Sequence, residues 1–172
     1  ESGKVALQDA IGRIQSMMVL YNRLYRSENI TNLALSDYIP PLMTEIMGIF
    51  PQAERIKVVT RIDDIVLKVE ALAMLGIILN ELITNSMKYA FKGRPGGTIT
   101  FNAIRQNNET SGSASGIELT FGDDGVGLPE QIDFNYTTSL GLQLVDMLVK
   151  QLKGTISIER NEGTRYKIVI PG

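Results

Sequence analysis

The 172-residue sequence contains no cysteine and no histidine. Without cysteine there is no disulfide framework, no thiolate metal site and no cysteine nucleophile. Without histidine the chain lacks the usual general base, the commonest zinc ligand and any serine–histidine triad. Chemistry in this chain therefore depends on carboxylates, amides, lysines, backbone groups or a bound ion.

The sequence also has little net charge and no long apolar run, which argues against a nucleic-acid-binding protein and a membrane-spanning segment. Lys and Arg number 17 against 19 for Asp and Glu, and no basic block indicates nucleic-acid binding. The longest apolar stretch, residues 71–79, is too short to cross a bilayer. The first four residues do not form a signal peptide and look like the middle of a longer chain. We therefore expect one ordinary domain with a short appendage, cytoplasmic, from a parent protein that can be membrane-bound.

Residues 7–25 predict an amphipathic helix, because their apolar side chains recur at i, i+3, i+4 and i+7. Such a helix needs something to lie against. Its partner is either the remainder of this domain or the other helix of a hairpin or dimer bundle. The pattern stops near residues 27–29, so we place a boundary between residues 1–30 and residues 31–172.

The remaining sequence predicts helices that alternate with mostly antiparallel strands. Ser36 and Asp37 predict the N-cap of a second helix, with Pro40 and Pro41 in its first turn and Pro51 at its end. This order favours an α+β fold, a two-layer α/β sandwich. The further predicted helices are residues 71–91 and 140–152, and the predicted strands are residues 56–62, 66–70, 98–104, 117–121, 155–159 and 166–170, with a polar hairpin loop at residues 106–116.

The first motif with chemical content lies on the long helix, in residues 80–90. Glu81, Asn85 and Lys88 are spaced i, i+4, i+7 and share one face of a regular helix. Carboxylate and amide oxygens suit a hard cation such as Mg²⁺, and the ammonium group suits a phosphate. Alone, the same pattern also describes a solvated helix face.

Two glycine-bearing turns follow. Residues 123–129 place Asp123 beside Gly125 and Gly127, where the backbone can approach a ligand and the carboxylate can accept a hydrogen bond from an amine such as that of adenine. Residues 138–145 open a helix whose free amides favour an anion, with Gly141 giving close access. Taken singly, the first is also an acidic turn and the second an ordinary N-capped helix. Thr164, after Gly163, is a fourth and weaker element.

The order N-E-L-x-x-N-x-x-K-Y-A, D-x-G-x-G, S-L-G-L and G-T resembles the ATP-binding domain of histidine kinases. The resemblance covers roughly residues 35–172 and implies the Bergerat ATP-binding fold, a mixed, mostly antiparallel sheet with helices on one face. Residues 10–38 are similar to the second dimerisation helix of the HisKA_2 group, close to the HWE kinases. In that group the phosphorylated histidine lies on the preceding helix, which this chain lacks.

The resemblance also implies roles for individual residues. Asn85 resembles the Mg²⁺ ligand, with Glu81 beside it, and Lys88 and Tyr89 are placed for phosphate and ribose. Asp123 resembles the aspartate that binds the adenine amine, and Thr164 the hydroxyl that supports it through water. The implied catalytic set is Glu81, Asn85 and Lys88, and the implied nucleotide-binding set is Asn85, Lys88, Tyr89, Asp123, Gly125, Gly127, Leu128, Ser139, Leu140, Gly141, Leu142 and Thr164.

The implied function is transfer of the γ-phosphoryl group of ATP to an upstream histidine, in cis or in a dimer partner. The implied cofactors are ATP and Mg²⁺, and the implied partners are a response regulator and a second copy of the full-length protein. The alternative is an ATP- or ADP-binding regulatory module, like the anti-sigma relatives, or a degenerate domain. The intact Asn85 and Asp123 argue against degeneracy, and the helix at residues 7–25 favours the kinase.

Overall fold

The structure, a computed structural model, describes residue 18 and residues 31–107, 114–128, 140–160 and 162–171. The predicted helix at residues 7–25 lies outside the described residues except for Met18, and so does Ser139. The boundary placed after residue 30 therefore stays a prediction.

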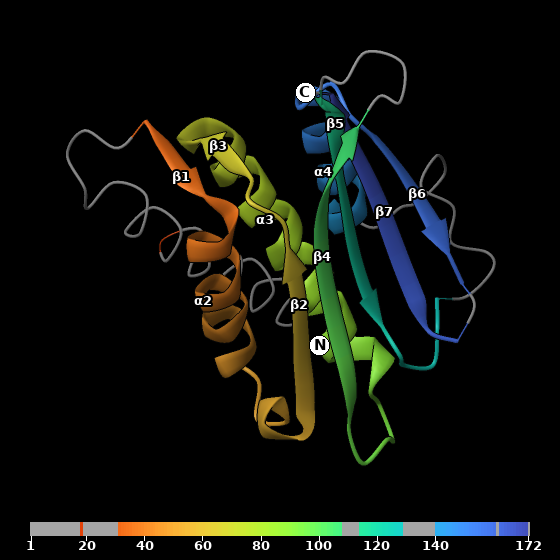
Figure 1. The fold of residues 1–172 in the computed structure, drawn as a ribbon. Helices are drawn as coiled ribbons and strands as arrows, with labels where there is room; N and C mark the ends of the chain where they lie inside the picture. Colours follow the sequence, from red (N-terminus) through yellow and green to blue (C-terminus); the bar gives the residue numbers. More distant parts are fainter. Residues whose placement is uncertain (1–17, 19–30, 108–113, 129–139, 161, 172) are drawn as a thin grey trace.

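A five-stranded sheet forms one layer, in the order β2-β4-β5-β7-β6. β2 pairs with β4 in parallel, whereas the other neighbours are antiparallel. Helices α2, α3 and α4 lie on one side of this sheet (Figure 1), which confirms the predicted two-layer α+β arrangement. The bounds are Ile56–Ile62 for β2, Gly97–Asn107 for β4, Ala114–Asp123 for β5, Thr155–Glu159 for β6, Thr164–Pro171 for β7, Leu35–Gly48 for α2, Val69–Asn85 for α3 and Leu140–Gln151 for α4.

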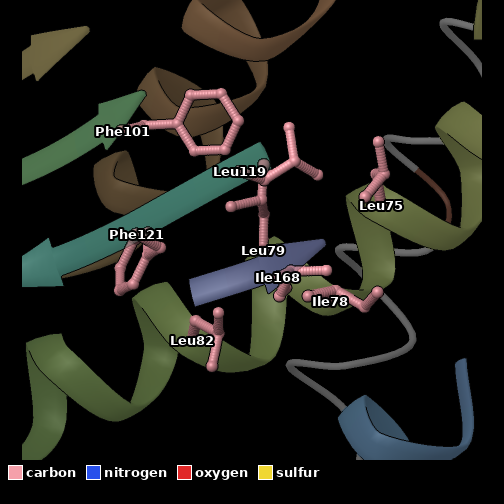
Figure 2. Close-up of a pocket in the computed structure, with 8 residues that line it drawn as sticks. All are labelled: Leu75, Ile78, Leu79, Leu82, Phe101, Leu119, Phe121 and Ile168. Carbon is pink, nitrogen blue, oxygen red and sulfur yellow. The ribbon is translucent and has the colours of Figure 1, made fainter. Parts of the chain in front are cut away.

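The core lies where α3 crosses the middle of the sheet. Leucine and isoleucine side chains of α3 meet aromatic and aliphatic side chains from β4, β5 and β7 (Figure 2). The gap between them has a volume of about 10 Å³ and an entirely apolar lining, so it is a packing defect rather than a ligand site. The contacting residues are Leu75, Ile78, Leu79, Leu82, Phe101, Leu119, Phe121 and Ile168.

The alternation of each strand decides which side chains face the helices. On β7 the buried positions are Thr164, Tyr166, Ile168 and Ile170, every second residue. Thr164 and Tyr166 lie at the start of β7, beside Asp123, because Thr164 pairs with Asp123 across β5 and β7. Polar residues of β7 therefore enter the helix-facing side of the sheet only at this end.

Helix α2 begins earlier than predicted, because its N-cap lies two residues before Ser36, the first of the two predicted cap residues. Its N-cap is Ala34, which makes no side-chain cap, and the backbone amide of Leu35 donates to the carbonyl of Ile65 at 2.8 Å. The prediction of a Ser36–Asp37 cap was wrong because a tertiary contact, not a side chain, fixes the first turn. Pro40 and Pro41 consequently fall in the second turn, where each removes a helical hydrogen bond.

The predicted strand at residues 66–70 is shorter and has a different partner. β3 spans Val66–Lys68 and pairs with β1, Asn32–Ala34, in a two-stranded antiparallel sheet apart from the main one. Glu70 already belongs to α3. β1 was not predicted, because its three residues are too few to show a strand period.

The predicted helix at residues 71–91 changes its geometry near its end. α3 is followed directly by a π-helical turn, η2, at Ser86–Ala90. Together they span Val69–Ala90, the one segment in the described part of the chain long and apolar enough to cross a membrane. More than half of the apolar part of this segment, 56%, is buried within the protein. Its apolar composition is therefore explained by its place in the core.

Candidate functional site

One cavity lies at the end of the molecule where η2, β5, β7 and α4 meet. It has a free volume of about 100 Å³ and opens to solvent. It brings together four stretches far apart in the sequence: the end of the long helix, the end of β5 with the glycine turn after it, the first turn of α4, and the start of β7. The lining residues are Asn85, Ser86, Tyr89, Ala90, Asp123, Gly127, Leu128, Leu142, Thr164 and Tyr166.

The carboxylate of Asp123 is fixed by two donors. The hydroxyl of Ser86 donates to Oδ2 at 2.7 Å, and the amide of Gly125 donates to Oδ1 at 3.1 Å. Asp123 is buried at 9% exposure, and both hydrogen bonds are buried. Charge-assisted bonds of this kind are about twice as strong as neutral ones. The carboxylate is therefore presented to the cavity in one orientation, with free lone pairs for a further donor.

The glycine turn lies directly against the end of η2. A side chain at Gly125 would collide with the carbonyl and Cβ of Ala90. The next amide, that of Val126, donates to the same carbonyl at 2.9 Å. Gly127 has a φ of +80°, a conformation that favours glycine. The two glycines therefore have separate tasks: Gly125 permits close approach, and Gly127 turns the chain along the cavity wall.

The π-helical turn begins directly after Asn85 and sets the directions of the later residues of the motif at 80–90. In a π-turn the hydrogen bonds run from i to i+5, so the helix is wider than the α-helix assumed from the sequence. Asn85 and Tyr89 line the cavity, whereas Glu81 and Lys88 do not. Glu81 is instead buried at 2% exposure, one turn before Asn85. Of the three residues expected on one face, only Asn85 lines the cavity.

Ser86, Ala90 and Tyr166 line the cavity but were not among the predicted site residues. Ser86 and Ala90 lie within the motif at residues 80–90, but neither has a role among those that the family resemblance implies. Tyr166 could have been found, since it lies two residues after Thr164 and faces the same side of β7. Burial raises the pKa of the Tyr166 phenol above its usual range, and the nearby Asp123 carboxylate adds to the shift. The phenol therefore stays protonated well above neutral pH.

The start of α4 closes the cavity on one side. Leu142 is buried and lines it, while Gly141 is buried in the first turn without reaching it. Leu140 is 67% exposed and does not line the cavity. The first amides of a helix carry partial positive charge and lack helical partners. This end of the site therefore favours an anion.

The donor set suits a metal ion only when a ligand completes the coordination. Within the described ranges, no group of three or more His, Cys, Asp or Glu residues could hold a metal ion. Asn85 offers one amide oxygen at the cavity. Mg²⁺ in proteins commonly keeps several waters and takes one or two side chains plus phosphate oxygens. The residues present therefore fit Mg²⁺ that arrives with a polyphosphate.

The sequence matches the family model of the histidine kinase-, DNA gyrase B- and HSP90-like ATPases over residues 72–172, more than half of the chain. The chain belongs to this ATPase family. A second family model, that of the HisKA_2 histidine kinases, matches residues 1–50. The matched ATPase region contains the site residues from Asn85 to Tyr166, so the cavity lies in the part of the chain that defines the family.

Individual relatives of this ATPase-family chain are sensor kinases. The sensor histidine kinase PdtaS of Mycobacterium tuberculosis is 28% identical over 176 residues, 98% of this chain and 33% of that protein. The blue-light-activated histidine kinase 2 of Erythrobacter litoralis is 30% identical over 117 residues, 67% of this chain and 32% of that protein. The chain thus spans about a third of the length of the curated relatives it matches.

Solved structures agree with the family assignment. The histidine kinase domain of the Erythrobacter litoralis EL346 blue-light-activated kinase superposes with a TM-score of 0.76 at 25% identity, covering 93% of this chain and 73% of that one. The ATP-binding domain of PrrB from Mycobacterium tuberculosis shares the fold, with a TM-score of 0.58 at 22% identity, covering 84% of this chain and 98% of that one.

Proposed function

We propose that this chain is the ATP-binding catalytic part of a sensor histidine kinase. It binds ATP in the cavity at Asp123 and supports transfer of the γ-phosphoryl group to a histidine outside this sequence. The observation that carries the proposal is the Asp123 carboxylate, oriented by Ser86 and Gly125 in a cavity that Asn85 also lines.

Adenine recognition follows from what Asp123 can accept. Its two oxygens each take one donor from the protein, which leaves lone pairs for the exocyclic amine of adenine. Guanine presents a carbonyl oxygen at the same position, which a carboxylate repels. Thr164, buried beside Asp123, supplies a hydroxyl for the water-mediated support that the family resemblance implies.

The phosphate end of the proposed site is built from Asn85 and the start of α4. Bound Mg²⁺ would supply charge neutralisation of the phosphates, with Asn85 as its protein ligand. The first amides of α4, near Leu140 and Gly141, favour the phosphates, and Ser139 belongs to the same proposed contact. Tyr89, at the cavity rim, and Lys88 beside it serve the ribose and phosphates. Glu81, buried one helical turn before Asn85, would help to organise the metal ion and its water.

The transfer itself is mainly a matter of positioning. A bond forms between a histidine ring nitrogen and the γ-phosphorus while the bond from that phosphorus to the β–γ bridging oxygen breaks, leaving ADP. The chain holds no histidine. The acceptor therefore comes from elsewhere in the full-length protein, in cis or from a second copy, and a response regulator would receive the phosphoryl group next.

Calorimetry with Asp123→Asn tests the proposal. The substitution removes the charge and replaces one of the two accepting oxygens with an NH2 group, so we expect ATP affinity to fall about tenfold or more. Asp124→Asn is the matched control, because Asp124 lies outside the cavity lining and its Oδ1, which accepts from the amide of Thr98 at 2.8 Å, survives the change. Equal ATP affinity in the wild type and Asp123→Asn would show that the adenine assignment is wrong.

Phosphoryl transfer is tested separately with ATP labelled on its γ-phosphate. We expect no acid-labile label on this chain alone, and label on an added histidine-bearing segment of the full-length protein. ATP binding without any such transfer would instead favour the regulatory module, which binds ATP or ADP as a switch. The match to the HisKA_2 family over residues 1–50 favours the kinase.

A further inference from the structure

The last turn of the helix that carries Asn85 ends at Ala90, and its final carbonyls have no helical amide to accept from. Two of them are satisfied by groups from other parts of the chain. The amide of Val126 donates to the carbonyl of Ala90 at 2.9 Å. The side-chain Nε2 of Gln52 donates to the carbonyl of Met87 at 2.7 Å. The second bond joins residues 35 apart in the sequence.

Gln52 is itself held firmly. It precedes the short 3-10 helix η1, Ala53–Arg55, and its carbonyl accepts from the amide of Arg55 at 3.0 Å. The neighbouring side chains of Phe50 and Ala53 pack against the core cluster. Gln52 therefore presents its amide to Met87 from a fixed backbone, and little side-chain entropy is lost on forming the bond.

The carbonyl that Gln52 satisfies lies inside η2, between the cavity-lining pairs Asn85–Ser86 and Tyr89–Ala90. A π-turn is rare, and it persists where surrounding contacts favour it over a regular α-helix. If residues 85–90 returned to α-helical spacing, the side chain of Lys88 would turn toward the helix face of Asn85. The side chain of Tyr89 would turn partly away from its present direction. The set of side chains at the cavity would then change.

We propose that Gln52 is a positioning residue for the nucleotide site. It acts through the Met87 carbonyl to hold the π-turn that places Asn85, Ser86 and Tyr89 at the cavity, and it touches no ligand itself. The expected effect of Gln52 on ATP affinity rests on the proposed function, whereas its expected effect on η2 does not. Gln52 lies between the HisKA_2 match, which ends at residue 50, and the ATPase match, which begins at residue 72. Its bond to Met87 therefore links the nucleotide site to the segment that follows the HisKA_2 region.

The test compares Gln52→Met, which keeps the side-chain length but has no donor, with Gln52→Lys, which keeps an N–H donor and suits a helix C-terminus. Gln151→Met, on the exposed end of α4, is the matched control. Hydrogen exchange measured by mass spectrometry reports on residues 86–91, and calorimetry reports ATP affinity. If Gln52 only filled space, methionine would replace it without loss. These readouts therefore distinguish a space-filling role from a positioning role.

We expect Gln52→Met to speed exchange at residues 86–91 and to weaken ATP binding by about fivefold, the factor that corresponds to one hydrogen bond. Gln52→Lys should recover most of both effects, and Gln151→Met should resemble the wild type. Unchanged exchange and affinity in Gln52→Met would overturn the proposal, and so would equally faster exchange throughout the sheet. Failure of the wild type to bind ATP would refute the proposed function, while the exchange experiment would still decide whether Gln52 holds η2.

Discussion

Replacing Ser86 with alanine removes one donor from the Asp123 carboxylate and leaves the shape of the cavity almost unchanged. The bond lost is short, 2.7 Å between Oγ and Oδ2, and buried. A hydrogen bond to a charged group contributes about 1.5–3 kcal/mol. Because the cavity is open, water can replace part of the lost interaction at Oδ2, so we expect a loss of stability of about 1.5 kcal/mol.

The same substitution should weaken ATP binding. With Ser86 gone, only the amide of Gly125 orients the carboxylate, and Asp123 must be ordered when adenine binds. An ordering cost of about 0.5–1.5 kcal/mol corresponds to a roughly two- to tenfold weaker affinity. Urea unfolding at neutral pH measures the stability, and calorimetry measures the affinity.

Ser36→Ala is the matched control, since Ser36 is an exposed serine on helix α2. Its effect on stability should stay within about 0.5 kcal/mol, with ATP affinity unchanged. If Ser86→Ala behaves like Ser36→Ala in both measurements, the Ser86–Asp123 bond does not organise the site. A double-mutant cycle with Asp123→Asn adds a direct check, because two residues in contact should show a coupling energy of about 0.5–3 kcal/mol.

Two further substitutions test the walls of the cavity. Gly125→Ala should destabilise the protein by about 1–3 kcal/mol in urea unfolding, because the new methyl group meets the carbonyl of Ala90. Gly48→Ala is the control, since nothing lies within 4 Å of the added carbon, and it should cause no loss of stability. Tyr166→Phe should flatten the alkaline decline in stability, because the unfolded phenol releases its proton near its ordinary pKa of 10.0 and the folded one retains it. Above that pH the wild type should lose about 1.4 kcal/mol per pH unit more than the variant, and parallel stability curves from about pH 9 to about pH 11 would contradict this.

The sequence predicted the layers of this fold well where periodicity carries the information. The apolar stripe of α3 recurs with the helical period, and Leu72, Leu75, Leu79 and Leu82 are all buried. β6 has the predicted bounds, 155–159. These elements are long enough, or alternate regularly enough, for local pattern to decide their structure.

Elements fixed by distant contacts were predicted less well. The start of α2 depends on the carbonyl of Ile65, which accepts from the amide of Leu35. The two residues are thirty apart in the sequence, and no local signal reveals that contact. β3 is a strand only because β1 pairs with it. In both cases the sequence showed an ordinary cap or strand pattern, and a tertiary partner determined the outcome.

The candidate site divides in the same way. The expectation that Asn85 and Asp123 share one cavity is confirmed, and it came from the order of several motifs rather than from any single one. The expectation that Lys88 shares the cavity with Asn85 assumed α-helical spacing, which the π-turn does not keep. Tyr166 needed only the two-residue period of a strand, yet the motif resemblance drew attention to Thr164 alone.

The π-turn itself explains why this cavity could not be read from the helix sequence. Residues 86–90 contain no glycine or proline that would mark a departure from the α-helix. The turn instead makes hydrogen bonds with groups from elsewhere: the side chain of Gln52 donates to the carbonyl of Met87, the amide of Val126 donates to the carbonyl of Ala90, and the hydroxyl of Ser86 donates to the carboxylate of Asp123. Each of these contacts joins the helix end to a segment more than thirty residues away in the chain. The shape of the nucleotide cavity is therefore a property of the assembled fold, and the motif supplies the side chains that this shape then selects.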